Sequence, residues 1–527
     1  MSRPVVWTVA GSDSGGGAGL QADLRAFEVM GVHGCCAVTA VTAQNSRHVH
    51  AVQPVAPEWL STQLSALAED LPPAVIKVGL LGSAEQARLL AQCVRRLREH
   101  RPVALVVDPV WRASSGAGLA GEALRAALCS QLLPLADVIT PNRAEAAWLL
   151  GERALQGSAA LQTAAKALQA TGAASVVITG GDAQEPHASD WLHTPQAIGE
   201  LRSARLPTHH THGSGCSFAA GLAAALALGF CEADAAVLAK ALVSDALAEP
   251  QQAGQGSGPV RPRPGFAGRV AAWPVLHPLD NGPAPCAAFA RCGDGALGLY
   301  PVVDRAEAVA WLAHAGVHTV QLRIKQADAG TLDREVAHAV QVARAHGLRL
   351  FINDHWQLAL RHQAYGVHLG QEDLVDADLP RLQAAGLRLG VSSHAPWEVA
   401  RALAVQPSYI ACGPVHPTQT KAMPWQPQGL HNLRFWSALL PLPVVAIGGL
   451  TPDRAREARA AGADGCAVLS GLAGEGRDAA LQRYREALQC DIGSAPPVPS
   501  LPRPTLPRAA PARCSAGAEP RLRHMPT

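Results

Sequence analysis

The C-terminal half of the chain contains short apolar runs that alternate with longer amphipathic segments. Eight of these runs are rich in Val, Ile and Leu and have the length of a buried strand. They lie at Gly298–Val303, His318–Arg323, Arg349–Asn353, Gly366–Leu369, Arg388–Ser392, Ser408–Gly413, Pro443–Gly448 and Asp464–Ser470. Ala- and Leu-rich stretches of helical period separate them, such as Arg305 to Ala315. Eight strands alternating with helices predict a (β/α)8 TIM barrel.

The N-terminal half shows a similar alternation with fewer and less regular runs. Its apolar runs are Val5–Ala10, Cys35–Ala43, Ala74–Leu81, Ala104–Val110, Val138–Thr140 and Ser175–Thr179. Helical stretches such as Glu85 to His100 lie between them. This order predicts an α/β layer domain with a mainly parallel sheet.

Two proline-rich segments divide the chain. Residues 250–285 carry eight prolines and six glycines without a hydrophobic period, which is typical of a linker. Residues 491–527 carry nine prolines and five arginines with few large apolar side chains. We therefore expect a folded domain at 1–265, a linker at 266–295, a barrel at 296–490 and a disordered tail at 491–527.

Composition limits the classes of function. Hydrophobic residues make up 48% of the 527 and charged residues 16%, which allows a large core and excludes wholesale disorder. The net charge of +2 gives no reason to expect a nucleic-acid partner. The longest apolar run, Phe218 to Cys231, is too short for a membrane helix, and Val5–Ala10 is too short for a signal sequence. We expect a cytoplasmic protein without a membrane partner.

Cysteine and lysine usage adds two points. The twelve cysteines include no C-x-x-C pair, which fits neither a zinc site nor a disulfide framework. Only five of the 44 basic residues are lysines, so a lysine retained against this bias is a candidate for a function. The five are Lys77, Lys166, Lys240, Lys325 and Lys421.

Polar side chains gather at the expected carboxyl ends of the barrel strands, where barrel enzymes hold their active sites. The polar candidates are Gln321, Arg323, Lys325, Asn353, Asp354, Asp373, Ser392, Thr418, Gln419, Thr420, Lys421 and Ser470, and the candidates beside them without a polar side chain are Ile324, Gly449 and Leu469. Arginine and lysine bind polyphosphate oxygens, and paired aspartates hold Mg²⁺ against a phosphate. The pattern predicts a Mg²⁺-dependent enzyme that acts on a pyrophosphate and a second phosphorylated molecule.

Each of these barrel features also has a simpler explanation when taken alone. Asp354 could cap a helix, Lys421 could be a solvated loop charge, and Gly448-Gly449 could be a turn. Their common place at strand ends favours a site over three separate structural roles.

Two glycine-rich segments stand out in the N-terminal half. Residues 11–19, GSDSGGGAG, follow the first strand but form neither a Walker A loop nor a clean G-x-G-x-x-G. Residues 212–216, HGSGC, precede an apolar helical stretch. Small residues at a helix start aim backbone N–H groups at an anion, which predicts a phosphate-binding turn; a plain glycine-rich helix start is the alternative.

The barrel half resembles thiamine-phosphate synthase through QLRIK, FIND, GVHLGQEDL, LGVSSH, GPVHPTQTK, VAIGGL and AVLS, over 296–473. The resemblance implies joining of hydroxymethylpyrimidine diphosphate to thiazole phosphate with release of pyrophosphate. It implies that Gln321, Arg323, Ile324, Lys325 and Asn353 bind the pyrimidine diphosphate, that Asp354 and Asp373 bind Mg²⁺, and that Ser392, Gln419 and Lys421 contact substrate. Thr418, Thr420, Gly449, Leu469 and Ser470 would hold the thiazole phosphate. A dissociative break of the pyrimidine CH₂–O bond needs charge neutralisation and no protein nucleophile.

The first half resembles hydroxymethylpyrimidine/phosphomethylpyrimidine kinase, a ribokinase-like fold, through AGSDSGGGAGLQADL, VTAQNS, KVGLLGS, VVDPV, ITPNRAEA and HGSGCSFAAGLAAAL, over 4–250. The resemblance implies two ATP-dependent phosphorylations that yield the diphosphate consumed by the barrel. It places Gln44 on the pyrimidine with Asp23 and Thr42 nearby, and Mg²⁺ at Asn142, Glu145 and Asp108. Gly213, Gly215 and Cys216 would form the anion hole, and Cys216 would be either the base or a small residue that fits. Lys77 is expected to have a structural or loop-ordering role.

The chain departs from the kinase pattern at two phosphate-neutralising lysines. The family often has Lys within the segment matched by Arg112 to Ser115, and again where this chain has Thr179. Arg112 or Arg143 would be the substitutes. Two alternatives therefore stay open for this half, namely a degenerate pyrimidine-binding module and a pyridoxine/pyridoxal kinase.

Both fold families often self-associate, but the sequence indicates no oligomeric state.

Overall fold

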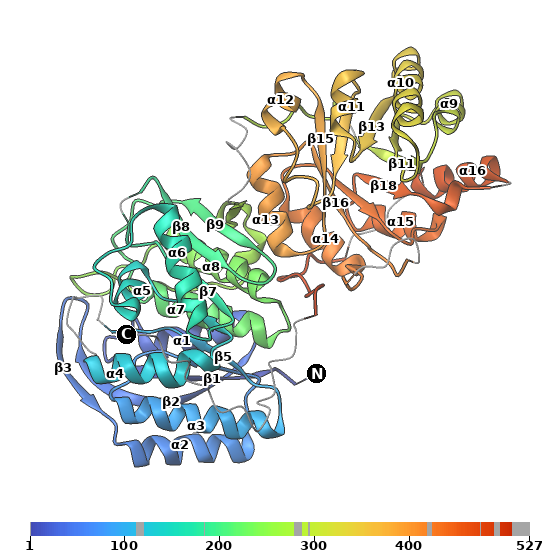
Figure 1. The fold of residues 1–527 in the computed structure, drawn as a ribbon. Helices are drawn as coiled ribbons and strands as arrows, with labels where there is room; N and C mark the ends of the chain where they lie inside the picture. Colours follow the sequence, from blue (N-terminus) through green and yellow to red (C-terminus); the bar gives the residue numbers. More distant parts are fainter. Residues whose placement is uncertain are drawn as a thin grey trace.

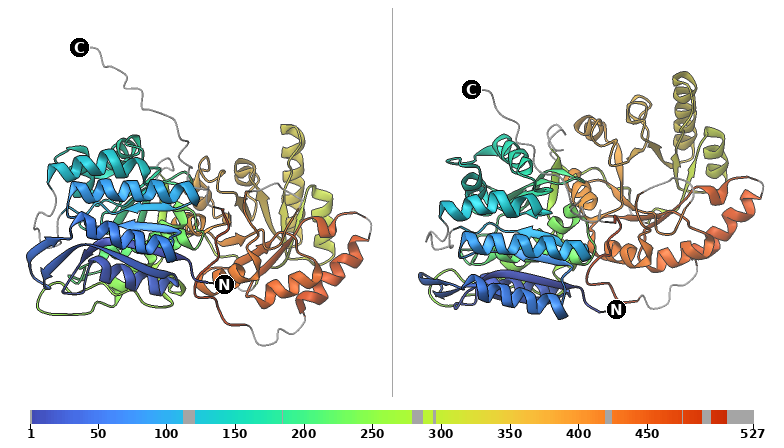
Figure 2. Two further views of the ribbon diagram at one scale, coloured as in Figure 1. Left: turned by 90° about the horizontal axis from the view of Figure 1, so that it is seen from below. Right: turned by 60° about the horizontal axis from the view of Figure 1, so that its bottom comes forward.

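Two sheets, one open and one closed, organise the chain (Figure 1). The computed structural model describes residues 2–111, 121–183, 185–278, 287–293, 296–418, 424–474, 476–489 and 496–507. Both further views in Figure 2 show the two sheets in separate lobes that lie side by side. None of the helices in these ranges is long and apolar enough to cross a membrane.

The N-terminal lobe is a ten-stranded sheet within the described residues, in the order β10-β9-β8-β7-β6-β5-β4-β1-β2-β3. Its elements are β1 (Val5–Ser12), α1 (Gly19–Met30), β2 (His33–Gln44), β3 (Val49–Pro54), α2 (Pro57–Asp70), β4 (Val75–Val78), α3 (Ala84–His100), β5 (Ala104–Val107), α4 (Glu122–Ala127), β6 (Val138–Ile139), α5 (Arg143–Leu150), α6 (Gly157–Ala170), β7 (Ser175–Ile178), β8 (His187–His193), β9 (Ile198–Ala204), α7 (Ser214–Ala227), α8 (Glu232–Ala248) and β10 (Val275–Pro278). The central strands β2 to β7 in sheet order are parallel, which confirms the expected α/β layer domain.

Both faces of this sheet are buried, which explains why its strands are continuous apolar runs. Along β1 the side chains alternate, so that Val6 packs with α1, α7 and α8 while Trp7 packs with α2, α3 and α6. The strands that the apolar pattern did not predict are β3, β8, β9 and β10. They lie in antiparallel pairs toward the two edges of the sheet, and β8 carries the polar residues Ser189, Asp190 and His193, which are buried.

The C-terminal lobe is a closed parallel barrel of the strands β11 to β18, which confirms the TIM barrel. Its elements are β11 (Gly298–Val303), α9 (Ala306–His314), β12 (Thr319–Leu322), α10 (Ala329–Ala345), β13 (Arg349–Asn353), α11 (Trp356–Arg361), β14 (Gly366–Leu369), α12 (Leu379–Ala384), β15 (Arg388–Ser393), α13 (Pro396–Val405), β16 (Tyr409–Cys412), α14 (Gly429–Leu439), β17 (Val444–Ile447), α15 (Pro452–Ala460), β18 (Gly465–Val468) and α16 (Arg477–Gln489). All eight predicted strands are present.

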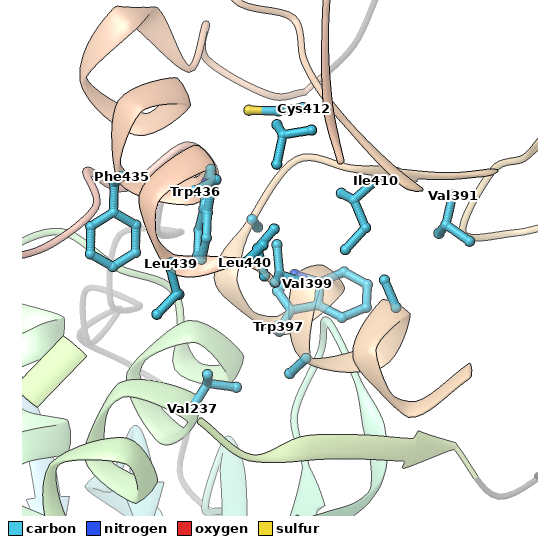
Figure 3. Packing of buried hydrophobic residues seen from close by; sticks show 14 of the residues in the cluster. Val237, Val391, Trp397, Val399, Ile410, Cys412, Phe435, Trp436, Leu439 and Leu440 are labelled. Atoms are coloured by element: carbon cyan, nitrogen blue, oxygen red, sulfur yellow. The ribbon is translucent and has the colours of Figure 1, made fainter. Parts of the chain in front are cut away.

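The two lobes share a continuous apolar core rather than a loose tether. Helices α13 and α14 of the barrel face α8 and β10 of the first lobe. Figure 3 shows Val237 of α8 below Trp397, Leu439 and Trp436 of the barrel. The indole of Trp273, which precedes β10, meets that of Trp436 edge-on with ring centres 5.3 Å apart.

Two local expectations were wrong in part of their range. The expected linker contains β10, which pairs antiparallel with β9, and Trp273 and Leu276 around it are buried. The expected disordered tail contributes residues 496–507, in which Leu501 and Leu506 pack against the shared core. Proline-rich composition lowered the expectation of order, but sheet pairing and a few apolar side chains stabilise both segments. The domain boundaries themselves stay predictions.

Candidate active sites

The first candidate site is a cavity of about 660 Å³ above the carboxyl ends of the central parallel strands of the first lobe. Such a crevice is where open α/β sheets bind ligands, because loops from neighbouring strands diverge there. Eight of the predicted site residues line it, from four segments of the chain: the end of β2, the loop after β5 and the starts of α5 and α7. They are Thr42, Gln44, Asp108, Asn142, Glu145, Gly213, Gly215 and Cys216.

Asp13 fixes the glycine-rich segment on one wall of this cavity. Its carboxylate accepts hydrogen bonds from the backbone N–H groups of Gly15 (2.8 Å), Gly17 (2.9 Å) and Ala18 (2.8 Å), and His212 Nε2 lies 3.1 Å away. Burial acts to raise the pKa of Asp13, but these hydrogen bonds outweigh it and lower the pKa. Asp13 therefore stays ionised and ties the segment to the turn that begins at His212.

The start of α7 packs directly against that glycine-rich segment. Gly213 has φ of 79°, and a Cβ at this position would collide with the carbonyl oxygen of Gly17. Only glycine adopts this positive φ without strain and leaves room for the Gly17 carbonyl, so the glycine at this position of the HGSGC pattern has a steric cause. Gly213, Gly215 and Cys216 at the N-terminus of α7 line the cavity, and the first N–H groups of a helix have no partner within it and can bind an anion. The anion hole stays a prediction.

Cys216 has a thiol that is hard to ionise in this environment. Burial raises its pKa to about 12, although the nearby Lys77 ammonium acts in the opposite direction. The sequence pattern suggested easier thiolate formation at a helix N-terminus, and the surroundings of the thiol do not support this.

Asp23 lies in a different place from the one expected. It is fully buried and does not line the cavity. Its carboxylate accepts a hydrogen bond from Thr8 and pairs with Lys77 at 3.0 Å. Lys77 itself lines the cavity floor and also lies 3.6 Å from Asp108. Burial acts to lower the pKa of Lys77, but the two carboxylates raise it. Asp23 thus supports a buried lysine below the cavity rather than touching a ligand in it.

Asp108 and Glu145 offer carboxylate oxygens that suit a divalent cation. Asp108 Oδ2 is buried and has no hydrogen-bond partner among the described residues. Burial raises the pKa of Asp108 to about 6, and burial together with Asp108 raises that of Glu145. A bound cation would lower the pKa of both carboxyl groups by stabilising their charged forms, and Mg²⁺ needs only one or two protein carboxylates besides phosphate oxygens. No group of three or more His, Cys, Asp or Glu side chains in the described ranges forms an all-protein metal cage.

The N-x-x-E pattern also has a local structural role. Asn142 Oδ1 accepts the N–H of Glu145 at 2.8 Å, and Glu145 Oε2 accepts the N–H of Asn142 at 2.8 Å. This is a capping box at the start of α5. The box engages one oxygen of Glu145 and orients its carboxyl group toward the cavity that it lines.

Several cationic side chains near the cavity already have partners. Lys240 of α8 lines it and lies 2.8 Å from Asp190, and Arg143 pairs with Glu185 at 2.7 Å. Thr179 lines the cavity as the sequence suggested, and Arg112 lies outside the described residues. The rarity of lysine in this chain made Lys240 a candidate for a function, but no sequence pattern placed it in the kinase site.

The second candidate site is the mouth of the barrel. Lys325 Nζ lies 2.9 Å from Asp354 Oδ2, and the partly buried Arg323 directly follows β12, two residues before Lys325. Asp354 has φ of 64° and does not cap α11, whose N-cap is His355. Burial and the Asp354 charge raise the pKa of Asp373. Two neighbouring carboxylates of this kind fit a divalent cation that would also bind a diphosphate.

A chain of hydrogen bonds inside the barrel supports this mouth from below. The hydroxyls of Tyr300 and Tyr409 lie 2.8 Å apart, and Tyr409 OH lies 2.8 Å from His368 Nδ1. His368 Nε2 in turn lies 2.9 Å from Ser392 Oγ. Gln321 Nε2 donates to Tyr300 OH at 3.4 Å, so the chain joins two predicted substrate residues. The sequence reasoning missed His368 and both tyrosines, although their inward places in short strands were readable.

The remaining predicted barrel residues take the following places. Asn353 is buried at the end of β13, and Ile324 packs against the core. Gly449 has φ of 64° in the turn after β17, and Arg454 donates to its carbonyl oxygen at 2.8 Å. Leu469 and Ser470 follow β18, where Ser470 begins a short 3-10 helix. Thr418 precedes the residues Gln419, Thr420 and Lys421, which lie outside the described ranges.

Comparisons with known proteins assign both halves. Residues 13–261 match the family model described as phosphomethylpyrimidine kinase, and residues 299–472 match the one described as thiamine monophosphate synthase. The Arabidopsis thaliana protein named thiamine biosynthetic bifunctional enzyme TH1, chloroplastic, is 37% identical over 89% of this chain and 90% of its own length. The hydroxymethylpyrimidine/phosphomethylpyrimidine kinase of Synechococcus elongatus is 44% identical over 49% of this chain and 97% of its own.

Among solved structures, the ADP complex of Bacillus subtilis pyridoxal kinase is 35% identical and covers 49% of this chain and 97% of its own, with a TM-score of 0.46. The nearly full-length relative decides the family, because its similarity extends over both lobes in the same order. The chain belongs to the family of bifunctional thiamine biosynthetic enzymes, with a phosphomethylpyrimidine kinase domain followed by a thiamine monophosphate synthase domain.

Proposed function

We propose that residues 1–265 phosphorylate hydroxymethylpyrimidine and then its monophosphate with ATP, and that residues 296–490 join the resulting diphosphate to thiazole phosphate. The observation that carries this proposal is the presence of two separate polar sites in one chain, each built at the carboxyl ends of parallel strands. The product of the first reaction is the substrate of the second. The substrates are small molecules, and we propose the cytoplasm as the compartment.

In the kinase cavity, Gln44 and Thr42 would contact the pyrimidine, and the N–H groups of Gly213, Gly215 and Cys216 would stabilise charge on the transferring phosphoryl group. Asp108 and Glu145, with Asn142 as the cap that orients Glu145, would hold Mg²⁺. When bound, this ion would neutralise nucleotide phosphate oxygens. Because the Cys216 thiol has a raised pKa, we propose that it shapes the anion hole as a neutral group rather than acting as a base.

Lys77 supplies a fixed positive charge at the floor of the cavity. Its ion pairs with Asp23 and Asp108 hold the ammonium in place without exposing it to bulk solvent. Lys77 and Lys240 thus give the cavity two lysines, although Arg143 is engaged by Glu185 and Thr179 carries no charge.

At the barrel mouth, Arg323, Lys325 and Lys421 would bind the diphosphate, and Asp354 and Asp373 would hold Mg²⁺, which would neutralise the departing pyrophosphate when bound. Gln321, Ile324, Asn353, Ser392 and Gln419 would form the pyrimidine side of the site. The backbone near Gly449, Leu469 and Ser470, with Thr418 and Thr420, would hold the thiazole phosphate. The enzyme then only needs to place the thiazole nitrogen opposite the breaking CH₂–O bond.

The test is an end-product assay on the full chain. Hydroxymethylpyrimidine, thiazole phosphate, Mg²⁺ and ATP are supplied, and thiamine phosphate is measured by chromatography. We expect product that depends on ATP. If product forms only when the pyrimidine diphosphate is supplied directly, the synthase assignment stands and the kinase assignment is wrong. If neither mixture gives product, both assignments are wrong. Pyridoxal as a competing kinase substrate tests specificity in the same chain.

A further inference from the structure

The turn between β15 and α13 connects the synthase site to the domain interface. Ser392, which we assign to the pyrimidine side of the synthase site, is the penultimate residue of β15. Only His394 and Ala395 separate β15 from the first residue of α13, Pro396. The place of Ser392 at the mouth is therefore set by the same short turn that starts α13.

The start of α13 has no cap of its own. Its N-cap residue is Ala395, which has no side-chain acceptor, and Pro396 has no N–H group. The first free N–H, that of Trp397, donates at 2.9 Å to Oδ1 of Asp234. Asp234 lies in the first turn of α8, in the kinase domain, and is fully buried. A carboxylate of one domain thus caps a helix of the other.

Four further hydrogen bonds fix the same turn from within the barrel and from the C-terminal segment. Glu398 Oε2 accepts the backbone N–H of His394 at 2.6 Å. The carbonyl oxygen of His394 accepts Thr505 Oγ1 at 2.6 Å and Gln428 Nε2 at 2.5 Å. Gln371 Nε2 donates to the carbonyl oxygen of Ser392 at 2.7 Å. With its polar groups held on several sides, the turn transmits a shift of α13 to Ser392 rather than absorbing it.

A buried acid at this position needs a reason, because the surrounding interface is apolar. Val237, Trp397 and Leu439 belong to the apolar cluster that crosses the interface (Figure 3), and taking a carboxyl group out of water is costly unless it is paired. The hydrogen bond to an uncapped helix start is the compensation that the structure shows. An apolar residue of similar size would fill the same space but would leave the Trp397 N–H without an acceptor.

We propose that Asp234 of the kinase domain is a positioning residue for the synthase reaction: by capping α13 across the domain interface it holds the β15–α13 turn, and with it Ser392, in the geometry that binds the pyrimidine diphosphate. This inference rests on the proposed role of Ser392. The kinase domain then supplies the synthase not only with substrate but also with part of the framework of its site.

Helix α8 also borders the kinase cavity, which makes the kinase assay an internal control. Lys240 lies six residues after Asp234, roughly 9 Å along the helix axis at 1.5 Å per residue. It lines the cavity and pairs with Asp190 at 2.8 Å. A substitution that displaced α8 as a whole would alter kinase activity, whereas loss of the cap alone would not.

The experiment uses the full chain with Asp234→Leu, Asp234→Ala and Asp234→Asn. Leucine keeps the volume in an apolar interface, where replacing a buried charge is often tolerated, and asparagine keeps an oxygen acceptor. Synthase activity is measured with supplied pyrimidine diphosphate and thiazole phosphate, kinase activity with hydroxymethylpyrimidine and ATP, and Tm by calorimetry. We expect the leucine and alanine variants to raise the synthase KM for the pyrimidine diphosphate at least tenfold, with kinase kcat/KM within twofold of wild type. Asparagine should restore the synthase KM to within about threefold.

Asp245→Ala is the matched control, because Asp245 is the other buried acid of α8 and pairs with Arg263 at 2.9 Å and Arg269 at 2.8 Å. It should lower Tm without changing the synthase KM. An unchanged synthase KM in Asp234→Leu and Asp234→Ala would overturn the proposal, as would an asparagine variant as impaired as the leucine one. Failure of the proposed function would differ, since it would show as an inactive wild-type synthase.

Discussion

Buried charge distinguishes the two sites at the scale of single residues. In the kinase domain, Lys77, Asp23 and Asp108 form a cluster closed off from solvent, with Lys77 and Asp23 fully buried. In the barrel, Lys325 and Asp354 pair at a wetter mouth, where the lysine side chain is about half exposed. A closed cluster is preorganised and little screened, whereas the open pair can separate when a diphosphate arrives.

Cys216 provides a test of the kinase site at this scale. Because burial raises its pKa to about 12, its alkylation by iodoacetamide should still increase close to tenfold per pH unit between pH 8 and 10. Peptide mass spectrometry of a time course at each pH gives the rate at this residue, with the exposed Cys36 as reference in the same chain. A rate that levels off below pH 9 would contradict the neutral thiol and return Cys216 to the candidates for a base.

His368 provides a test in the barrel. Burial lowers its pKa to about 4, against about 6.5 in an unfolded chain. Below pH 6.5 the unfolded state therefore binds more protons, so the stability that the neutral imidazole contributes is lost as the pH falls from 6.5 toward 4. By this linkage the loss is about 2 kcal/mol at pH 5.

His368→Gln should lack this pH-dependent part of the free energy of unfolding. Urea midpoints of wild type and variant at pH 7 and pH 5 measure it, and the stability difference between the two should shrink by about 2 kcal/mol at the lower pH. His346→Gln, at an exposed position after α10, controls for the loss of a surface histidine. A constant difference would mean that His368 is not held neutral.

At the scale of elements, both sites depend on backbone conformations at the ends of strands and the starts of helices. Gly213 begins α7 with a positive φ against the carbonyl of Gly17, and Gly449 turns the chain after β17. Ala395 and Pro396 leave α13 uncapped, and a distant carboxylate completes it. The geometry of each site therefore depends on a few positions at which the backbone is held in one conformation.

Gly449→Ala tests the turn after β17. The position has φ of 64°, and a Cβ would lie 2.7 Å from the Pro417 carbonyl oxygen and 2.9 Å from the His416 Cβ. We expect a stability loss of roughly 2–3 kcal/mol and a KM for thiazole phosphate raised at least tenfold.

The matched control is Gly347→Ala, which has the same φ of 64° but open space around the added methyl group. It should cost about 1 kcal/mol from backbone strain alone and leave the KM for thiazole phosphate unchanged. Chemical denaturation and initial rates of both variants show whether the effect of Gly449→Ala comes from backbone strain alone or also from the close approach of the added methyl group to its neighbours. Equal losses in the two variants would show that the contact with His416 and Pro417 is unimportant.

At the scale of the whole molecule, the two domains are held together by a core that crosses the interface. Trp273, Trp397 and Trp436 belong to the same cluster of buried side chains as Val237 of α8. The described part of the C-terminal segment lies against α14, where His431 Nε2 lies 2.9 Å from the carbonyl oxygen of Leu501. The arrangement is that of one cooperative unit rather than two tethered domains.

Truncation measures how much the C-terminal segment contributes to thermal stability and to synthase activity. A chain ending at residue 495 loses the packing of Leu501 and Leu506 and the hydrogen bond from Thr505 to His394. Its Tm should fall by roughly 5 °C, and synthase activity should fall more than kinase activity. A chain ending at residue 507, which retains every described residue of the segment, is the control and should behave as the intact chain. Equal Tm values for the two truncations would contradict a stabilising role.

Sequence reasoning chose eight residues that line the kinase cavity, because glycine-rich turns and strand-end carboxylates carry their chemistry in local patterns. It did not foresee that Asp23 pairs with Lys77 below the cavity or that Lys240 lines the cavity, since pairing of charges from different elements is invisible along the chain. Arg143 was a candidate substitute for a missing lysine until the structure showed its pairing with Glu185. The roles of these residues in catalysis stay predictions.

The sequence by itself determined the barrel and the parallel sheet and predicted a site at the strand ends of each, because apolar periodicity and strand-end chemistry are local properties of the chain. Only the tertiary structure decided which buried charges pair, that proline-rich segments pack as β10 and as residues 496–507, and that Asp234 caps a helix of the other domain. The physical reason is the same in each case: these contacts join residues that are far apart along the chain, and their energy depends on burial and distance, which no local pattern records.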